Sequence, residues 1–319
     1  MPSPALSIII PVYNEAVNLA GVLEQIHALG LEDYEIIVVD DGSSDGSAAM
    51  AAARGARVVR HPYNIGNGAA VKSGLRAARG RWIVMLDADG QHPPQAIPLL
   101  LEHLERYHMV VAARVRSTEA SWHRMLANRF YSWFASYVSQ FDVEDLTSGF
   151  RAMHRWVALK FLDLLPNTFS YPTTLTLAVL RSGLALKYVR IEFGQRQGHS
   201  KIRLWEDGTR FLLIISKVAT LFAPFRVFLP VSGAFFALGV GYYGYTFLTE
   251  HRFTNMAALL LSTSVVIFMM GLVSEQIAQM RMDRQGVHEE GELAEAEEGS
   301  EIAPPREARP PRLRADGRS

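Results

Sequence analysis

The stretch WIVMLDADGQH, residues 82–92, contains the features that decide the fold. An apolar run of strand character is followed at once by two carboxylates on alternate residues, Asp87 and Asp89, and by the turn-forming Gly90. Alternate residues of a strand point to the same side, so we expect both carboxylates to reach one point. Such oxygen ligands suit a divalent cation that keeps water and phosphate as its other ligands. An ordinary turn after a strand would use the same residue types, so the flanking sequence has to decide.

Short apolar runs alternate with helical patterns on both sides of this stretch. The apolar runs lack a regular polar alternation, which is typical of strands buried on both faces; they comprise residues 7–12, 35–40, 57–60, 81–87, 109–113 and 186–193. Apolar residues at helical spacing occupy residues 16–29, 45–53, 68–78 and 94–106. This alternation predicts an α/β fold with a Rossmann-like, doubly wound parallel sheet. Ligands of such sheets bind beyond the carboxyl ends of the strands.

Composition excludes several classes of protein. Lysine plus arginine number 32 and aspartate plus glutamate 32, so the overall charge indicates no nucleic-acid partner. The absence of cysteine excludes disulfides, zinc–thiolate sites and thiol nucleophiles. The N-terminal MPSPALSIIIPVYNE lacks the basic region and the cleavage site of a signal peptide, so we expect it to form the first strand. We find no internal repeat.

Polar residues collect where the predicted strands end. PVYNE at residues 11–15 follows the first strand, and DDGSSD at residues 40–45 follows the second and offers acceptors for a ribose or a base. NIGNG at residues 64–68 enters a helix, whose N-terminus favours anions. Val71 stands where a dinucleotide-binding GxGxxG motif requires its last glycine, which disfavours a Rossmann dehydrogenase. Each turn taken singly is also explained by capping of the next helix.

Five motifs in this order are specific, although each alone is weak. They are PVYNE, VVDDGSSDGS, NIGNGAA, MLDADGQHPP and DLTSGFRAM, which begin at residues 11, 38, 64, 85 and 145. The set resembles the family 2 glycosyltransferases with the GT-A fold. Within that family it is similar to the dolichyl-phosphate mannose synthases and the bacterial polyprenyl-phosphate glucosyltransferases. The resemblance covers about residues 5–280 and implies a GT-A catalytic domain over residues 1–202.

The resemblance also implies roles for single residues. It implies a nucleotide-sugar pocket lined by residues of the first two motifs, namely Pro11, Tyr13, Glu15 and Asp40. Asp87-Ala88-Asp89 resembles the DxD motif that binds Mg²⁺ or Mn²⁺ and the donor, and Gln91 matches a residue that faces the metal and the donor diphosphate. Asn67 departs from many relatives, in which lysine or a bulky residue is common.

Neutralisation of the leaving group can be argued from chemistry. A nucleoside diphosphate leaves only if its growing negative charge is neutralised, and a cation on Asp87 and Asp89 would act there as a Lewis acid. Further polar groups lie in QRQGHSKIR, residues 195–203, namely Arg196, His199, Ser200 and Lys201. Glycine and serine suit a loop that closes over the diphosphate. In the related synthases the equivalent loop contacts donor phosphates, which favours this role over a basic patch that touches lipid headgroups.

A second group of basic residues suits an acceptor phosphate. It comprises Arg114, Arg116, Arg124 and Arg129. The last two lie in the aromatic-rich residues 121–141, a pattern typical of a helix at a bilayer surface; a packed amphipathic helix of the catalytic domain is the alternative. Guanidinium groups match phosphate geometry, and basic residues in this region of the resembling synthases hold the lipid phosphate. We therefore assign Arg114 and Arg129, with Ser148, to the acceptor phosphate.

Asp145 stands where many inverting glycosyltransferases use a carboxylate to deprotonate an acceptor hydroxyl. The second ionisation of a phosphate monoester lies near neutrality, so its oxygen is already an anion and needs no strong base. We therefore assign Asp145 to orienting the acceptor or the loop, with Ser148 and Arg151 as phosphate or structural partners.

The C-terminal part predicts attachment to a membrane. Residues 227–249 and 253–274 are uncharged, and each exceeds the roughly 20 residues needed to span a bilayer. The short charged connection at residues 250–252 makes them a hairpin, so that two spans occupy residues 226–284. Residues 203–225 before them are amphipathic and are expected to lie on the membrane surface.

The charges that flank the spans predict their orientation. Arg226 precedes the first span, and Arg281 and Arg284 follow the second, which places the catalytic domain in the cytoplasm by the positive-inside rule. Residues 285–319 are first acidic and then rich in proline and arginine, so we expect a disordered cytoplasmic tail.

The sequence therefore predicts a cell-membrane enzyme that transfers a hexose from a nucleotide sugar to a polyprenyl phosphate with inversion at the anomeric carbon. GDP-mannose is the favoured donor and UDP-glucose the second. One alternative is a family 2 transferase with a hydroxyl acceptor, although the QxxRW-like motif of chain-extending members is absent. A non-catalytic membrane scaffold is the other, and the intact Asp87, Asp89 and Gln91 argue against it. The oligomeric state is not indicated.

Overall fold

The computed structural model describes residues 4–115, 136–137, 141, 143–167, 171–194, 220 and 223–298, with side chains up to residue 280. These residues form two compact units. The α/β unit contains the described residues up to 115 and from 141 to 194, and the helical unit contains residues 136–137, 220 and 223–298.

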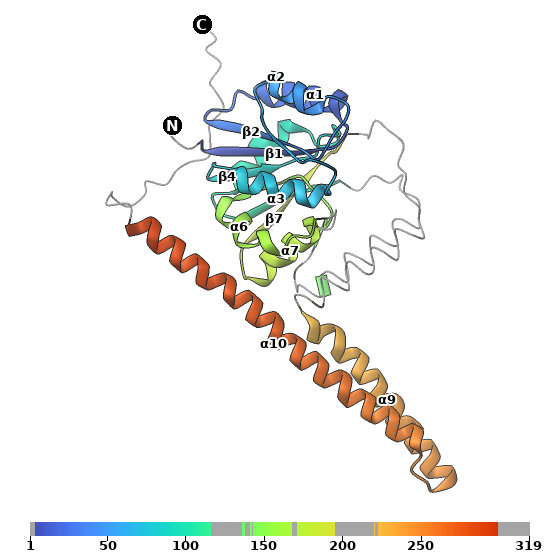
Figure 1. Ribbon diagram of the computed structural model, residues 1–319. Coiled ribbons are helices and arrows are strands. Elements are labelled where there is room, and N and C mark those ends of the chain that lie inside the picture. The colour runs from blue at the N-terminus through green and yellow to red at the C-terminus, as the bar shows by residue number, and fades with distance from the viewer. Residues whose placement is uncertain are drawn as a thin grey trace. The chain divides into compact units, whose positions relative to one another are not determined.

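The α/β unit is built on one seven-stranded sheet with the order β3-β2-β1-β4-β6-β5-β7 (Figure 1). Its strands are β1 (Leu6–Val12), β2 (Tyr34–Asp40), β3 (Arg57–Arg60), β4 (Trp82–Met85), β5 (Met109–Arg114), β6 (Arg151–His154) and β7 (Leu186–Ile191). Six strands run parallel, while β6 runs antiparallel between β4 and β5. The α/β prediction is confirmed, with the correction that the sheet is mixed rather than wholly parallel.

Helices follow most of the strands (Figure 1). They are α1 (Ala16–His27), α2 (Ser47–Ala53), α3 (Asn67–Ala77), η1 (Pro94–Ala96), α4 (Ile97–His103), α6 (Arg155–Lys160), η2 (Leu162–Leu164) and α7 (Tyr171–Arg181). The four helices predicted between the first five strands are present within a few residues, although residues 94–106 divide into η1 and α4. Strand β6 and helices α6 and α7 were not predicted, because β6 is short and has no apolar run.

The sheet is buried on both faces, as its apolar strands predict. Along β1 the residues Ile8 and Ile10 belong to the core under α1 and α4. Ile9 lies on the other face, against α3. The closest approach is at Gly74, where a Cβ atom would lie 2.4 Å from Cγ2 of Ile9 and 3.1 Å from Cγ2 of Val39. Helix α3 can therefore pack tightly on β1 and β2 only because this position has no side chain.

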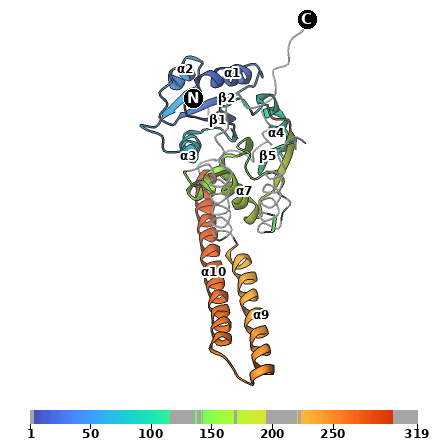
Figure 2. The ribbon, with the colours of Figure 1, turned by 90° about the vertical axis from the view of Figure 1, so that its right-hand side faces the viewer.

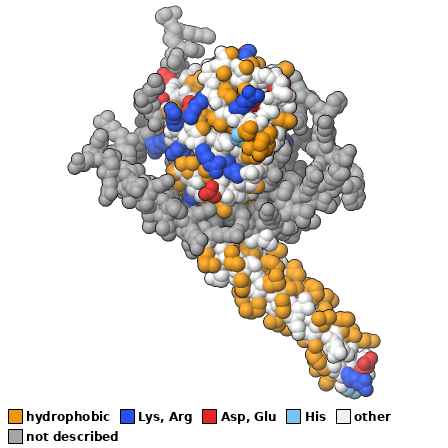
Figure 3. Space-filling model, in the orientation of Figure 1, with side chains coloured by type: hydrophobic (Ala, Val, Ile, Leu, Met, Phe, Trp, Pro, Cys, Tyr) orange, Lys and Arg blue, Asp and Glu red, His pale blue; other side chains and the backbone are white. Residues whose placement is uncertain are grey.

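The helical unit contains two long apolar helices, α9 (Pro224–Glu250) and α10 (Asn255–Glu298), which lie side by side (Figures 1 and 2). Pro224–Glu250 and Asn255–Met280 are long and apolar enough to cross a membrane, judged by length and composition. Apolar side chains cover the hairpin along its length, with charged groups at its tip, where residues 251–254 connect the helices (Figure 3). A core helix pair of a soluble protein would be buried, whereas only 11% and 17% of an apolar 18-residue window in these two helices is buried.

A pair of buried serines joins the two helices. Ser232 Oγ donates to the Ser264 carbonyl at 3.0 Å, and Ser264 Oγ donates to the Ser232 carbonyl at 3.1 Å. Replacing both serines by alanine should weaken the helix pair by about 1 kcal/mol, because hydrogen bonds between membrane helices contribute about 0.6 kcal/mol each. Unfolding in mixed micelles with increasing dodecyl sulfate measures this. The exposed Ser262 on the same helix is the control; equal effects of Ser264→Ala and Ser262→Ala would contradict the prediction.

The first turn of α9 has further polar contacts within the helical unit. The backbone N–H of Phe225 donates to Glu275 Oε2 at 3.1 Å, and Arg226 Nη1 donates to the Tyr137 carbonyl at 2.7 Å. Tyr137 is thereby joined to the start of the first apolar helix. Residues 203–219, most of the predicted interfacial segment, lie outside the described residues.

Helix α10 extends further than the sequence predicted. Its backbone is helical to Glu298, beyond Gln285, after which a disordered tail was expected. Residues 289–298 consist largely of glutamate and alanine, which favour the helix, and this explains the difference. Residues 299–319 lie outside the described part of the chain.

Candidate active site

Residues 87–90, called the DxD turn below, follow β4 at the carboxyl edge of the sheet. Strand β4 ends at Met85 and not at residue 87, so the alternation of a strand does not orient Asp87 and Asp89, and that part of the prediction is wrong. Both carboxylates are nevertheless partly exposed, whereas Ala88 between them is buried. Gln91 is tied to the turn, since its N–H donates to Asp89 Oδ1 at 3.1 Å.

His92 supports the turn from below. Its Nδ1 accepts the backbone N–H of Asp87 at 2.9 Å, so the ring is neutral with its proton on Nε2. The ring stacks on Phe150 and meets Phe193 edge-on, with centroid distances of 5.4 and 5.0 Å. Burial lowers the pKa of His92 from 6.5 to about 4. His92 was not assigned a role from the sequence, although it directly follows Gln91.

The buried His92 should make stability depend on pH. The unfolded chain takes up a proton at His92 below about pH 6.5, whereas the folded protein does so only near pH 4. The contribution of this group is therefore fully present above pH 6.5 and is lost as the pH falls towards 4, by up to about 3 kcal/mol. We expect the apparent Tm of His92→Asn, which keeps an acceptor for Asp87, to change less between pH 7 and 5 than that of the unchanged protein. Parallel pH profiles of the two proteins would contradict this.

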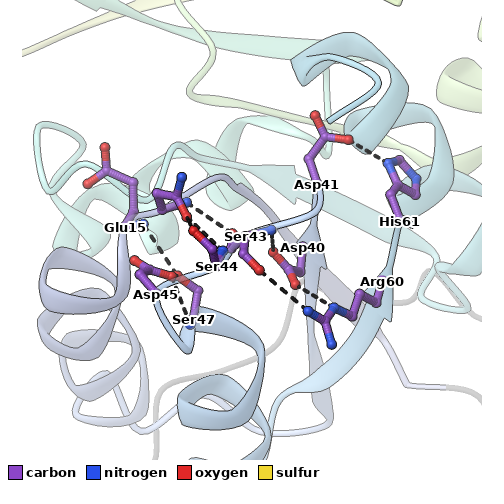
Figure 4. Close-up of polar contacts among 10 residues, drawn as sticks. Glu15, Asp40, Asp41, Ser43, Ser44, Asp45, Ser47, Arg60 and His61 are labelled. Carbon is purple, nitrogen blue, oxygen red and sulfur yellow. Dashed lines mark hydrogen bonds and ion pairs between the residues drawn. The ribbon is translucent and has the colours of Figure 1, made fainter. Parts of the chain in front are cut away.

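The turns after β1 and β2 interlock (Figure 4). Asn14, which has a positive φ of 56°, donates its N–H to Ser43 Oγ and accepts the Ser44 N–H at Oδ1, both at 2.9 Å. Asp45 accepts the N–H of Ala16 at the start of α1, and both the hydroxyl and the N–H of Ser47. Burial acts to raise the pKa of Asp45, but these hydrogen bonds, that of the Ser47 hydroxyl first, lower it. The structure therefore joins the turns after β1 and β2, which contain or adjoin the residues predicted to bind the nucleotide, at one edge of the sheet.

Of these residues, Pro11 is buried within β1, beyond the register with β4, which ends at Ile9. Tyr13 is half exposed, at 50%. Glu15 precedes α1, and its carboxylate accepts from the Asn18 amide at 2.7 Å. Asp40, in contrast, is fully buried, and Arg60 lies 3.2 Å from its carboxylate (Figure 4).

Asp41 holds the turn at residues 64–66, which leads into α3; the sequence did not indicate this role. Its carboxylate accepts the N–H groups of Ile65 at 3.0 Å and Gly66 at 2.8 Å, and it pairs with His61 Nδ1 at 2.7 Å. His61 Nε2 lies 2.8 Å from Ser73 Oγ on α3, so the contact chain runs from β2 to the helix. One buried carboxylate thus positions the loop that enters α3.

The Asp145 side chain holds its own loop by accepting hydrogen bonds from backbone N–H groups of that loop. Asp145 Oδ1 accepts from the N–H groups of Thr147 at 2.9 Å and Ser148 at 3.1 Å, which supports the predicted role of orienting this loop. Ser148 is fully buried, and its carbonyl accepts from Arg151. The assignment of Ser148 to an acceptor phosphate is therefore not supported by the geometry; the serine is internal.

Arg151 is structural rather than phosphate-binding, because it is fully buried. Its guanidinium donates to the carbonyls of Ser148 and Pro172 and to Thr176 Oγ1, which joins the 145–150 loop to α7. Burial lowers the pKa of Arg151, while Tyr171, Tyr188, Asp145 and Asp87 act in the opposite direction. An arginine remains protonated even so. A buried positive charge therefore interacts with Asp87 of the DxD turn, and Arg151 pairs with Met85 on the neighbouring strand.

Arg114 lies at the edge of this site. Its side chain is over the ring of Phe193 at 5.3 Å, and its backbone N–H approaches Asp145 Oδ2 at 3.4 Å. The other predicted phosphate-binding residues lie outside the described residues, namely Arg116, Arg124, Arg129, Arg196, His199, Ser200 and Lys201. Gly194, just before this last group, donates its N–H to the Gln91 carbonyl at 2.9 Å.

Two family models match the chain. The model described as Glycosyl transferase family 2 matches residues 7–163, and the model described as GtrB C-terminal hairpin matches residues 223–280. The chain belongs to glycosyltransferase family 2. The first match contains all the turns described above, and the second coincides with the apolar hairpin. The protein is therefore a glycosyltransferase.

Proteins similar to this glycosyltransferase match it over half or more of its length. It is 28% identical over 302 residues to the undecaprenyl-phosphate 4-deoxy-4-formamido-L-arabinose transferase of Aeromonas hydrophila, with 87% of this chain and 90% of that protein covered. It is 32% identical over 191 residues to the protein of the same name from Serratia proteamaculans, with coverage of 54% and 59%.

Solved structures share the fold of the glycosyltransferase. Glucosyl-3-phosphoglycerate synthase from Mycobacterium tuberculosis in complex with phosphoglyceric acid has a TM-score of 0.55 at 23% identity, with 68% of this chain and 80% of that chain covered. Its complex with Mn²⁺, UDP-glucose and phosphoglyceric acid has a TM-score of 0.55 at 22% identity with the same coverage. The likeness shows the GT-A fold.

Proposed function

We propose that this glycosyltransferase transfers a sugar from a nucleotide sugar to a polyprenyl phosphate at the membrane surface. The observation that carries the proposal is the match to undecaprenyl-phosphate sugar transferases over 87% of the chain, which includes the apolar hairpin as well as the catalytic unit. A hairpin that holds the enzyme at a bilayer suits a lipid acceptor. The flanking arginines favour a catalytic unit in the cytoplasm.

Several features support a divalent cation, Mg²⁺ or Mn²⁺, at the DxD turn. Asp87 and Asp89 offer carboxylate oxygens, the ligands that such ions prefer. The space beside them is kept open by Gly149, at which a Cβ atom would lie 3.0 Å from Asp87 Oδ2. Among the described residues no three His, Asp or Glu side chains are grouped to hold a metal. The donor phosphates and water would therefore complete its coordination, and the ion would neutralise charge on the leaving diphosphate.

The residues of the chain would then act by positioning. His92 and Gly194 fix the backbone on either side of the DxD turn. Burial and the neighbouring Asp87 carboxylate raise the pKa of Tyr171, so its hydroxyl stays protonated and can donate. Asp145 holds its loop and accepts no proton from the acceptor, because a phosphate monoester is already anionic near neutral pH. Arg114, and with it Arg129, Arg196 and Lys201, would bind phosphate groups.

The sugar is the finer part of the proposal. The sequence favours mannose from GDP-mannose, with glucose from UDP-glucose as the second candidate. The similar bacterial proteins are named for 4-deoxy-4-formamido-L-arabinose, and about 28% identity supports a polyprenyl-phosphate acceptor better than it supports one sugar. The donor therefore has to be determined by experiment.

The test is a donor comparison. Membranes that contain the protein are incubated with undecaprenyl phosphate, Mg²⁺ or Mn²⁺, and labelled GDP-mannose or UDP-glucose, and the lipid fraction is examined for a sugar that mild acid releases. We expect label in this fraction with one donor, and none when the lipid phosphate is omitted. Label in water-soluble or polymeric products with either donor would instead indicate a hydroxyl acceptor and would refute the proposed acceptor.

A further inference from the structure

The carboxylate of Asp40 is not available to a ligand in this structure. Its side chain is fully buried. Oδ1 accepts the Ser43 N–H at 2.9 Å, and Oδ2 lies 3.2 Å from Arg60 Nε. Oδ1 is therefore hydrogen-bonded within the protein, whereas Oδ2 is buried and meets Arg60 as an ion pair without a hydrogen bond. A buried carboxylate needs such partners, because an unpaired charge would be strongly unfavourable there.

Arg60 presents its guanidinium at the edge where the nucleotide turns meet. The parallel register of β2 and β3 pairs Asp40 with Arg60, the last residues of both strands. Nη2 of Arg60 donates to the Ser43 carbonyl at 3.4 Å, and its side chain is 64% exposed. Within the part of the chain that the structure describes, Nη1 has no partner. Figure 4 shows the guanidinium against Asp40, with Ser43 nearby.

We infer that Arg60 contacts the nucleoside of the donor and that Asp40 is a positioning residue that acts through Arg60. The inference rests on the proposed function, because it requires a nucleotide at these turns. An arginine held through Nε keeps a planar face for stacking and free N–H groups for carbonyl or hydroxyl oxygens of a base or ribose. Because Asp40 and Ser43 already fix the side chain, little conformational entropy is lost on binding.

The opposite arrangement makes opposite predictions. If Asp40 contacted the base itself, the nucleotide would have to displace the Arg60 side chain from Asp40. Removing the Arg60 side chain would then leave nucleotide binding unchanged or make it tighter. The inference instead predicts that its removal weakens binding, since donor groups are lost.

Binding of UDP, GDP and pyrophosphate to the full-length protein in detergent with Mg²⁺, measured by calorimetry, separates these cases. Arg60→Ala should weaken binding of the preferred nucleoside diphosphate about 10- to 100-fold, the effect of one or two hydrogen bonds from a charged group. Pyrophosphate binding should not change, and Arg60→Lys should restore part of the affinity. Asp40→Asn keeps the acceptor for the Ser43 N–H. When it is added to Arg60→Ala, the double variant should bind the nucleoside diphosphate less than roughly 2-fold more weakly than Arg60→Ala alone, because both residues act through one contact.

Arg57 is the matched control. It lies at the other end of β3, is 43% exposed and pairs with Glu35 at 3.7 Å, so Arg57→Ala removes a similar arginine from the opposite edge of the sheet. The inference would be overturned if Arg60→Ala bound the nucleoside diphosphate as tightly as the unchanged protein or more tightly, while Asp40→Asn weakened its binding both in the unchanged protein and in Arg60→Ala. That result would leave the proposed function standing. If the unchanged protein bound neither UDP nor GDP more tightly than pyrophosphate, the proposed function would fail and the inference with it.

Discussion

Asp89→Ala is expected to lower sugar transfer roughly 10³-fold, the scale of losing electrostatic stabilisation worth several kcal/mol at a leaving group. Asp89 is partly exposed in the DxD turn, so the fold should not depend on its charge. Asp89 Oδ1 also accepts the Gln91 N–H, and Asp89→Asn keeps an acceptor for that bond while removing the charge. Both variants should be similarly inactive in the lipid-labelling assay.

The control for this change is Asp163→Ala, whose side chain is 92% exposed in η2, away from the DxD turn in the sequence. It should transfer sugar at the normal rate. Near-normal transfer by Asp89→Ala would exclude the proposed cation site. An active Asp89→Asn beside an inactive Asp89→Ala would show that the turn, and not the charge, is what transfer requires.

Arg151→Leu is expected to destabilise the α/β unit by about 3 kcal/mol or more, because the carbonyls of Ser148 and Pro172 and the Thr176 hydroxyl lose a buried donor. For a domain of this size the apparent Tm should fall by roughly 10 °C. A thermal melt in detergent, followed by tryptophan fluorescence, measures the change.

Arg106→Leu provides the comparison, since Arg106 is exposed after α4 and its side chain makes no hydrogen bond or ion pair among the described residues. Its melting temperature should change by a degree or two at most. If Arg151→Leu melted like Arg106→Leu but bound lipid phosphate poorly, Arg151 would be a phosphate ligand, and its structural assignment would be wrong.

The sequence predicted the features that depend on local pattern. The apolar runs located six of the seven strands, and the uncharged runs located α9 and the start of α10, because burial in a sheet or a bilayer requires continuous apolar sequence. The antiparallel β6 escaped prediction because Arg151 and His154 interrupt a four-residue strand. Its partners on both sides provide its environment, and these are distant in the sequence.

Within the candidate site, motifs of neighbouring residues could be recognised from the sequence, but contacts between distant residues could not. The assignment of the DxD turn and of the turns after β1 and β2 rests on their order along the chain and stays a prediction. The pairing of Asp40 with Arg60 depends on the register of two strands, and the internal position of Ser148 depends on Arg151 and α7. Residue type alone indicates neither, since serine and aspartate are also typical residues of turns.

The hydrogen bond from the Gly194 N–H to the Gln91 carbonyl joins the chain that follows β7 to the turn that follows β4. A Cβ atom at residue 194 would lie 3.3 Å from the carbonyl oxygen of Gly90, so the close approach of the two backbones leaves little room for a side chain there. Two stretches that are distant in the sequence are therefore held together as one structural unit, and a bulky residue at position 194 would push them apart.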